Sequence, residues 1–273
     1  MIARIFNGSA RIDAWPADTR ALVYGDGLFE TMRVHRGTVP WWGAHWERLV
    51  RGARRLRISL PEQAQASDEA AVLFDGGGDG VLKLLLSRGG GGRGYAPSTA
   101  APLWMLSRHP LPAPYPHTGL QLRWCETRLA TQPLLAGIKH CNRLEQVLAR
   151  AECEAAGADE GLMLDSDGSV VSATSANLFV LRDGQWITPP LDHCGVAGVC
   201  RAHLLPLLDA CEARLPVADV ERADAVFLCN AVRGILRVAQ LGVRAWPAHP
   251  AVAQARHKLA RIHPGFAFDV EQS

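Results

Sequence analysis

The sequence predicts an α+β (mixed α/β) fold of two domains, and three observations support this prediction. The chain has 273 residues, which suits one or two domains. Strand-like apolar runs cluster along it, and helical periodicity intervenes irregularly, which argues against regular βαβ winding. Residues 109–117 contain four prolines, which disfavour helix and central strand and indicate an extended linker. We therefore expect a small N-terminal domain over 1–108, a linker over 109–118 and a larger C-terminal domain over 119–273.

The predicted N-terminal domain contains one clear helix and one strand pair. Apolar side chains recur at helical spacing over 44–58, and the same stretch carries five arginines, so the helix is amphipathic and basic. The apolar runs 81–87 and 102–107 flank a glycine-rich loop. These two runs predict a β-hairpin.

The predicted C-terminal domain alternates less regularly between helices and strands. Helical periodicity covers 142–156 and 199–208. Short apolar runs separated by Asp-Gly turn signals predict strands at 161–164, 169–171 and 178–181, and a further strand covers 225–229. We expect a mixed sheet in this domain.

The composition excludes several classes of protein. Lys and Arg number 29 against 27 Asp and Glu, so the charge gives no case for a nucleic-acid or anionic-membrane partner. No apolar run is long enough for a transmembrane helix, and the first residues lack the pattern of a signal peptide. The seven cysteines form no C-x-x-C pair, and the histidines show no metal-ligand spacing. We expect reduced thiols, a cytoplasmic location and no metal.

Lys139 is the residue that indicates chemistry most clearly. It lies in an otherwise apolar stretch immediately before the helix predicted at 142–156. Such a lysine either reaches out to water or is desolvated. Desolvation favours the neutral amine, which forms Schiff bases and accepts protons. The residues alone leave both alternatives open.

Five segments in order along the chain resemble the branched-chain/D-amino-acid aminotransferase group of pyridoxal-phosphate (PLP) enzymes, known as fold type IV. These segments are 24–31, 45–49, 135–148, 175–179 and 195–201. The runs 87–95 and 138–147 are specifically similar to the lyase branch of the group, the bacterial aminodeoxychorismate lyases. The resemblance spans almost the whole chain and implies a two-domain fold type IV enzyme.

The resemblance implies PLP as the cofactor and assigns residues to it. Lys139 would hold the PLP aldehyde as a Schiff base and act as the acid/base. Arg48 would bind the phosphate, whereas the alternative for it is a solvated position on a basic helix. The backbone N–H groups of Val199 and Cys200 would meet the phosphate at a helix N-terminus. The further matched cofactor contacts are Asn177, Asn230, Ala231 and Arg143. For Asn230 an ordinary strand end is as good an interpretation, and Arg143, four residues after Lys139 and so on the same helical face, has a surface position as its alternative.

Ser172 departs from the pattern of the group. Most members carry a glutamate five residues before the asparagine that matches Asn177, and it pairs with the pyridine nitrogen of PLP. Here that position is Ser172, and no acid occurs from 168 to 180. A serine supplies no negative charge, so the cofactor is expected to be a weaker electron sink. This departure counts more against transamination than against a lyase whose product becomes aromatic.

The resemblance therefore implies a lyase that converts 4-amino-4-deoxychorismate to 4-aminobenzoate and pyruvate in folate biosynthesis. Lys139 and Thr31 are the candidates for the proton donor to the pyruvate leaving group. Substrate contacts are expected from Arg88, Arg93, Tyr95, Tyr24 and Glu30, and for Arg88 and Arg93 a solvated position in a flexible loop is an equal alternative. Two alternatives stay open: an aminotransferase for D- or branched-chain amino acids, and a non-catalytic PLP-binding homologue. The resemblance also implies a homodimer.

Overall fold

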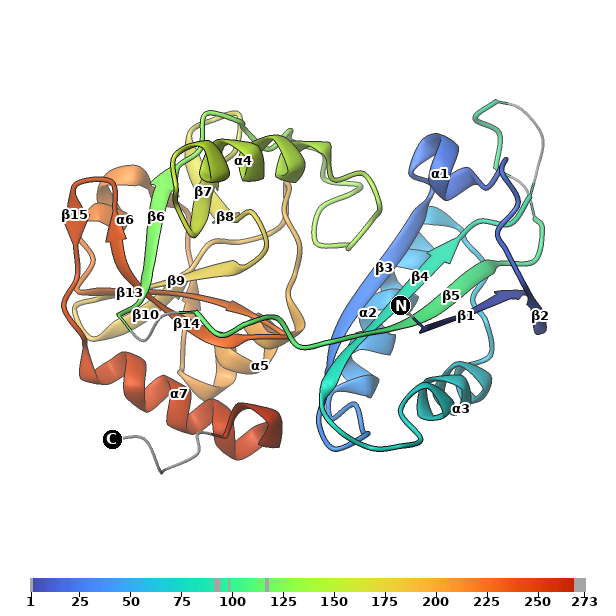
Figure 1. The fold of residues 1–273 in the computed structure, drawn as a ribbon. Coiled ribbons are helices and arrows are strands. Elements are labelled where there is room, and N and C mark those ends of the chain that lie inside the picture. The colour runs from blue at the N-terminus through green and yellow to red at the C-terminus, as the bar shows by residue number, and fades with distance from the viewer. Residues whose placement is uncertain (1, 91–93, 98, 116–117, 268–273) are drawn as a thin grey trace. The chain divides into compact units, whose positions relative to one another are not determined.

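The computed structural model describes residues 2–90, 94–97, 99–115 and 118–267, which form two compact units (Figure 1). The first unit consists of residues 1–112 together with 138–142, and the second of 113–137 together with 143–273. Residues 138–142, which contain Lys139, thus pack with the first unit, although the sequence places them in the domain predicted over 119–273. The domain ranges predicted from the sequence stay a prediction.

The first unit is built on a five-stranded antiparallel sheet with the strand order β2-β1-β5-β4-β3. Its strands are β1 (Ile2–Asn7), β2 (Ala10–Ile12), β3 (Gly27–Val34), β4 (Gly80–Ser87) and β5 (Leu103–His109). The predicted hairpin is confirmed, because β4 pairs with β5 over its whole length. Strand β3 is the last strand of this order, so one of its edges is not paired by a strand of the sheet.

Three helices belong to the first unit: α1 (Arg20–Tyr24), α2 (Trp42–Leu56) and α3 (Gln63–Leu73). The predicted basic helix is confirmed as α2. Its buried side, which includes Trp46, Leu49 and Ala53, faces the sheet, while Arg51, Arg54 and Arg55 are exposed. Helix α2 ends where Arg57 adopts a left-handed conformation with φ 55°. This packing places the α2 side chains His45 and Arg48 against β3.

The second unit contains a mixed sheet with the order β11-β10-β9-β13-β14-β6-β7-β8-β12, and β15 pairs with β14. Its strands are β6 (Leu120–Trp124), β7 (Glu160–Leu164), β8 (Ser169–Ala173), β9 (Asn177–Arg182), β10 (Gln185–Thr188), β11 (Cys211–Glu212), β12 (Leu215–Pro216), β13 (Ala225–Asn230), β14 (Gly234–Leu241) and β15 (Arg244–Ala245). Strand β6 is parallel to both its neighbours, β14 and β7. The four strands predicted in this part of the chain are confirmed as β7, β8, β9 and β13.

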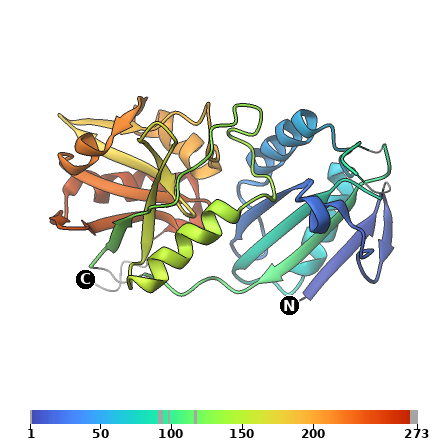
Figure 2. The same ribbon diagram turned by 90° about the horizontal axis from the view of Figure 1, so that it is seen from above.

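The helices of the second unit are α4 (Leu144–Ala155), α5 (Val199–Leu207), α6 (Val217–Glu221) and α7 (Pro250–Ile262), followed by a 3₁₀ turn at Pro264–Phe266. Figure 1 shows α4 and α7 on opposite sides of the strands of this unit, and Figure 2 shows the same elements from above. Side chains such as Leu162, Val180 and Val226 form the buried core of the unit. The predicted helices 142–156 and 199–208 are confirmed as α4 and α5. Among the helices of the described ranges, none combines the length and apolar character that crossing a bilayer requires.

The packing around Gly161 gives a test of the second core. A Cβ atom at Gly161 would lie 2.3 Å from the Cys125 Sγ and 2.6 Å from the Cys153 Sγ, and both thiols are buried. We predict that Gly161→Ala lowers the free energy of unfolding by about 1–3 kcal/mol, because an extra methyl group overpacks this core. Urea unfolding measures the change. Gly43→Ala is the matched control, since a Cβ there meets no atom within 4 Å, and equal effects of the two substitutions would contradict the packing.

Candidate active site

The segment that carries Lys139 is held by strand-like pairing with the beginning of β3. The Phe29 N–H donates to the Lys139 carbonyl at 2.9 Å, and the Cys141 N–H donates to the Gly27 carbonyl at 2.9 Å. Leu28 and His140 form the antiparallel bridge between these two bonds. The Asn142 Nδ2 adds a bond to the Gly25 carbonyl at 3.1 Å. Backbone bonds on both sides of Lys139 therefore fix where its side chain starts.

The Lys139 side chain lies against the ring of Phe29. Its Nζ is 4.2 Å from the ring centroid, which is within the range of a cation–π contact. Because side chains alternate along a strand, Thr31 shares the sheet face of Phe29. Lys83 is the register partner of Thr31 on β4, and its Nζ lies 5.5 Å from the same Phe29 centroid. Two amines, those of Lys83 and Lys139, thus lie at one aromatic ring, and Thr31 is on the same face of the sheet as that ring.

Sequence reasoning missed Lys83 and Phe29. The chain has only three lysines, Lys83, Lys139 and Lys258, and two of them lie at this ring. A signal for Lys83 was present, because it is the one charged residue in the apolar run 81–87, just as Lys139 interrupts an apolar stretch. Phe29 gave no separate signal, since a phenylalanine in a strand is usually part of a core.

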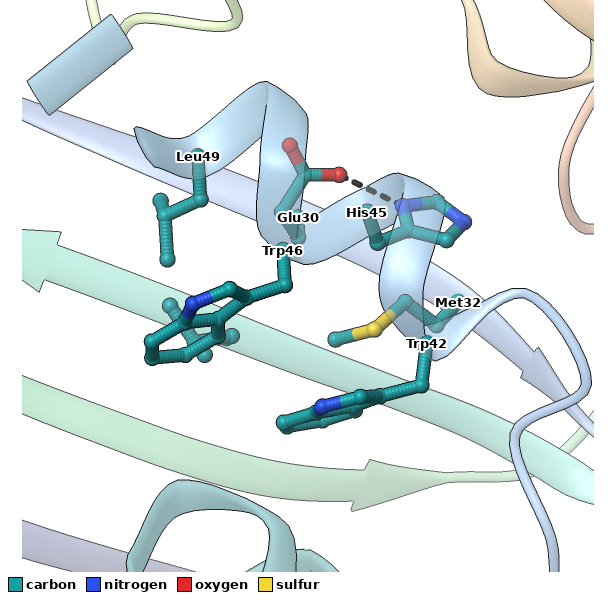
Figure 3. Close-up of a pocket in the computed structure, with 7 residues that line it drawn as sticks. Glu30, Met32, Trp42, His45, Trp46 and Leu49 are labelled. Carbon is teal, nitrogen blue, oxygen red and sulfur yellow. Dashed lines mark hydrogen bonds and ion pairs between the residues drawn. The ribbon is translucent and has the colours of Figure 1, made fainter. Parts of the chain in front are cut away.

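The opposite face of β3 carries a buried charged triad of Glu30, His45 and Arg48. The Arg48 Nε donates to the Glu30 Oε1 at 2.8 Å, and the Arg48 Nη2 donates to the Glu30 Oε2. The His45 Nδ1 lies 2.6 Å from the same Oε2 (Figure 3). The side chains are only 2%, 2% and 6% exposed, in the order Glu30, His45 and Arg48. Glu30 therefore binds two side chains from α2 at once.

The pKa shifts of Glu30 and His45 indicate which groups of the triad are protonated at neutral pH. Burial alone would raise the pKa of Glu30, but the charge of Arg48 and the hydrogen bonds from Arg48 and His45 outweigh burial and lower that pKa to about 2. Burial lowers the pKa of His45, although Glu30 acts in the opposite direction, and the charges of Arg48 and Lys139 lower it further. At neutral pH Glu30 is a carboxylate that only accepts, so the Nδ1 of a neutral His45 donates to it.

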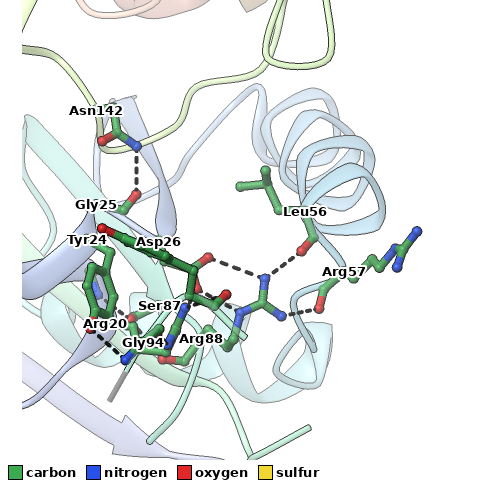
Figure 4. Close-up of polar contacts among 12 residues, drawn as sticks. Arg20, Tyr24, Gly25, Asp26, Leu56, Arg57, Ser87, Arg88, Gly94 and Asn142 are labelled. Carbon is green, nitrogen blue, oxygen red and sulfur yellow. Dashed lines mark hydrogen bonds and ion pairs between the residues drawn. The ribbon is translucent and has the colours of Figure 1, made fainter. Parts of the chain in front are cut away.

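Arg88 has a structural position, which revises the role expected from the sequence. It is 5% exposed, and its guanidinium donates to the Asp26 carboxylate, to the Leu56 carbonyl at 2.5 Å and to the Arg57 carbonyl at 2.5 Å (Figure 4). Arg88 therefore joins β4 to the C-terminal end of α2, and these contacts use the donors that a substrate carboxylate would need. The expected substrate contact of Arg88 is not carried further.

The other residues of the first unit that were expected to contact the substrate are Tyr24, Tyr95, Arg93 and Glu30. The Tyr24 hydroxyl accepts from the Gly94 N–H at 3.1 Å, and the Tyr24 and Tyr95 rings lie 5.5 Å apart. Tyr95 is 87% exposed. Arg93 lies outside the described residues. Glu30 was expected to contact the substrate. Its carboxylate instead accepts hydrogen bonds from His45 and Arg48, the other two members of the triad.

The N-terminus of α5 in the second unit can accept an anion. Gly198 is its N-cap residue and provides no side-chain cap, and the buried Val199 and Cys200 follow it. Within the described ranges, no backbone or side-chain acceptor bonds the N–H groups of Val199 and Cys200. A Cβ at Gly198 would lie 2.0 Å from the Asn177 Oδ1, so Asn177 and the start of α5 are in close contact. Uncapped amides at a helix N-terminus are suited to a phosphate.

Asn177 and Asn230 both brace backbone in the second unit. The Asn177 Nδ2 donates to the Val196 carbonyl at 2.9 Å, which connects β9 to the chain just before α5. The Asn230 Oδ1 accepts from the N–H groups of Val232 at 3.1 Å and Arg233 at 2.8 Å. Asn230 thus shapes the turn that contains Ala231. The Asn230 Nδ2 also donates to the Ser175 carbonyl at 3.4 Å, and a cofactor contact of this turn stays a prediction.

The relation expected between Lys139 and Arg143 is wrong. Lys139 lies in the segment paired with β3, and α4 begins only at Leu144, with Arg143 as its N-cap residue. Arg143 also belongs to the second compact unit, whereas Lys139 belongs to the first. The four-residue spacing therefore does not put the two side chains on one helical face. A role for Arg143 at the cofactor stays a prediction.

Ser172 lies on β8, opposite Met163 of β7, and is 9% exposed. No hydrogen bond of its hydroxyl occurs among the described residues.

Glu160 is a buried carboxylate for which the sequence predicted no role. It accepts from the Thr174 Oγ1 at 2.6 Å, the Thr174 N–H at 3.1 Å and the Ser175 hydroxyl. Glu160 therefore holds the turn between β8 and β9, and no motif in the sequence indicated this.

Comparisons with known proteins agree on one family. The family described as "Amino-transferase class IV" matches residues 27–241. The chain is 39% identical over 234 residues to aminodeoxychorismate lyase of Vibrio harveyi, covering 82% of this chain and 86% of that protein. The crystal structure of 4-amino-4-deoxychorismate lyase from Pseudomonas aeruginosa is similar with a TM-score of 0.86 and 43% identity, over 94% of this chain and 98% of the other. A hypothetical aminotransferase from Mycobacterium tuberculosis in its PLP-bound form shares the fold, with a TM-score of 0.81 and 21% identity over 96% and 99% of the two chains.

The lowered pKa of Glu30 predicts how stability depends on pH. Its pKa falls from the usual 4.5 to about 2 in the folded chain, so Glu30 stabilises the fold above pH 4.5, and this contribution is lost as the pH falls toward 2. The shift corresponds to at most about 3 kcal/mol. Glu30→Gln should therefore lower the free energy of unfolding at neutral pH and flatten its decline below pH 4.5.

Urea unfolding at a series of pH values, followed by tryptophan fluorescence, measures this difference. Glu47→Gln is the matched control, because Glu47 lies on the exposed side of the same helix. Parallel pH profiles for wild type and Glu30→Gln would contradict the prediction.

Proposed function

The chain belongs to the class IV aminotransferase family, and we propose that within it the chain is a PLP-dependent lyase that converts 4-amino-4-deoxychorismate to 4-aminobenzoate and pyruvate. The identities of 39% and 43% to two proteins named as this lyase support that reaction. The structural observation that carries the proposal is the position of Lys139, whose amine is held on the Phe29 ring by backbone pairing.

The donor set of this chain fits PLP. The amides of Val199 and Cys200 have no protein acceptor within the described ranges and suit the phosphate dianion. Arg48 provides a buried guanidinium, which also suits a phosphate. Lys139 provides the amine for the cofactor aldehyde, and the Ser172 hydroxyl is available for the pyridine nitrogen. Asn177, Asn230, Ala231 and Arg143 complete the proposed cofactor contacts.

In the proposed reaction, side chains of this protein remove one proton from the substrate and donate one proton to the leaving group. When bound, PLP supplies an electrophilic aldehyde and an electron sink for the bond broken at the amine-bearing carbon. Lys139 would hold the cofactor aldehyde through its Nζ, and once the substrate amine has taken its place, the free Nζ would accept the proton from the amine-bearing ring carbon. Loss of this proton and cleavage of the bond between the ring carbon and the enolpyruvyl oxygen make the ring aromatic. Lys139 or Thr31 would then return a proton to the methylene carbon of the departing enolpyruvate, which gives pyruvate. The reaction is balanced without another reactant, because the two products together contain the atoms of the substrate.

The side chains around the ring of Phe29 support the substrate assignment. Lys83 lies on the same sheet face as Thr31, and its ammonium is a candidate partner for a carboxylate of the small-molecule substrate. Tyr24, Tyr95 and Arg93 stay in the proposal as substrate contacts, whereas Glu30 and Arg88 are engaged by the protein itself. A place in folate biosynthesis follows from the proposed product. The cytoplasmic location and the homodimer are part of the same proposal, and sedimentation of the purified protein as a monomer would remove the homodimer.

Lys139→Ala tests the central residue. We predict that it abolishes formation of 4-aminobenzoate and pyruvate and also the covalent attachment of PLP, because no other amine has the position of Lys139. Borohydride reduction of the PLP-loaded wild type, followed by peptide mass analysis, should place the label on Lys139. Lys258→Ala is the control, since Lys258 is exposed on α7. A label on Lys83 or Lys258, or full turnover by Lys139→Ala, would overturn the assignment.

Ser172→Glu tests whether the serine at this position, where most of the group has a glutamate, makes the cofactor a weaker electron sink. A carboxylate at this position should strengthen the electron sink, so half-transamination of simple amino acids should become several-fold faster. Lyase turnover should change less, because aromatisation of the product supplies its own driving force. PLP affinity should change little, since Arg48 and the α5 amides hold the phosphate.

The half-reaction is followed by the loss of absorbance of the loaded cofactor after an amino acid is added. Ser172→Ala is the matched control, because it removes the hydroxyl without adding charge. An unchanged rate in Ser172→Glu would show that residue 172 does not contact the pyridine nitrogen. Fast half-transamination and no 4-aminobenzoate in the wild type would instead favour an aminotransferase, and bound PLP without any turnover would favour a non-catalytic homologue.

A further inference from the structure

The triad of Glu30, His45 and Arg48 is arranged to restrict one guanidinium. Arg48 and His45 lie three residues apart on α2 and so share a helical face. Glu30 reaches them from β3, and its two carboxylate oxygens accept different hydrogen bonds. The Oε1 accepts from the Arg48 Nε at 2.8 Å, and the Oε2 accepts from both the Arg48 Nη2 and the His45 Nδ1. Two parallel bonds to one carboxylate fix the plane of the guanidinium.

The surroundings leave the triad little freedom to rearrange. Glu30 and His45 line a pocket together with the apolar side chains of Met32, Trp42, Trp46 and Leu49 (Figure 3). The Trp42 and Trp46 rings stack on each other with centroids 5.8 Å apart. Glu30 cannot exchange its protein partners for water in this environment, because it is only 2% exposed. Glu30 is therefore held between His45 and Arg48 by hydrogen bonds to both.

We propose that Glu30 and His45 are positioning residues that orient Arg48 toward the phosphate of the cofactor. This inference rests on the proposed function, because it takes PLP as the ligand of Arg48. It adds roles for two residues that do not themselves touch the cofactor. His45 acts on Glu30, and Glu30 acts on Arg48.

Positioning and simple electrostatics predict opposite effects for Glu30. A carboxylate next to Arg48 cancels part of the positive charge that attracts a dianion. If charge alone mattered, removing the carboxylate would strengthen phosphate binding. If orientation matters more, removing it releases the guanidinium and weakens binding, because a long side chain must then be ordered by the ligand. The sign of the change therefore distinguishes the two effects.

The experiment compares PLP with pyridoxal, which has the same aldehyde and ring but lacks the phosphate. Both bind covalently at Lys139 in the proposed function, so the absorbance of the bound cofactor gives both affinities. We expect Glu30→Gln to weaken PLP binding about tenfold, or about 1.4 kcal/mol, and to leave pyridoxal binding unchanged. Glu47→Gln on the exposed side of α2 is the matched control and should change neither affinity.

Two variants of His45 keep the test independent of the stability of Glu30→Gln. Asparagine places its amide N–H near the position of the His45 Nδ1, so His45→Asn should keep most of the preference for PLP over pyridoxal. Leucine fills the space without a donor, so His45→Leu should lose that preference. A loss in His45→Leu that His45→Asn restores would identify the hydrogen bond to Glu30 as the cause.

The possible results separate this inference from the proposed function. Wild-type protein that retains no PLP would overturn the proposed function and the inference with it. Wild type that binds PLP while Glu30→Gln binds it more tightly, or unchanged, would overturn only the inference. Equal losses for PLP and pyridoxal would also overturn it, because they would show a general structural role. A selective loss of PLP affinity supports it.

Discussion

The pairing of residues 138–142 with the beginning of β3 is the contact on which the chemistry of this chain depends. It consists of two backbone hydrogen bonds and the Leu28–His140 bridge, together with the bond from Asn142 to Gly25. Through it, a short stretch from the middle of the sequence becomes part of a sheet built by the first third of the chain. The same strand carries the other candidate residues of the first unit: Phe29 and Thr31 project from one face of β3, and Glu30 reaches the α2 side chains from the other. The position of β3 therefore determines the positions of both the Lys139 amine and the buried Arg48 guanidinium.

Much of the fold could be predicted because its elements bury one face each. The helix α2 and the hairpin β4–β5 have clear periodicity, and so do α4, α5 and the strands β7 to β9. Helix α3 was not predicted, because it is rich in alanine and its buried positions Ala66, Ala70 and Leu73 hardly differ in polarity from the rest. Strand β3 was not predicted as a strand either, since Glu30 and Arg33 interrupt its apolar pattern. The reason is visible in the structure: Glu30 is buried because His45 and Arg48 of the next helix, α2, contact its carboxylate.

The candidate site was predictable to the extent that it follows motifs. Lys139 and Arg48 were singled out from a resemblance, and the structure adds what the motifs do not contain. No pattern of residues showed that Arg88 donates to the carbonyls at the end of α2. Helical spacing was misleading for Arg143, because the helix starts after it. Lys83 was overlooked although the argument used for Lys139 applied to it. For Arg88, partners distant in the sequence decide which donors are occupied, whereas for Arg143 the starting residue of the helix decides the outcome.

The edge position of β3 has a consequence for the order in which the chain is made. Residues 1–112 contain the five strands of the first sheet, but not the segment that pairs with the free edge of β3. During synthesis this edge stays uncovered until residues 138–142 have left the ribosome, and unpaired edges are places where chains associate wrongly. The same late arrival delivers Lys139. A nascent or truncated chain that ends before this segment therefore lacks both the partner of the beginning of β3 and the amine of Lys139.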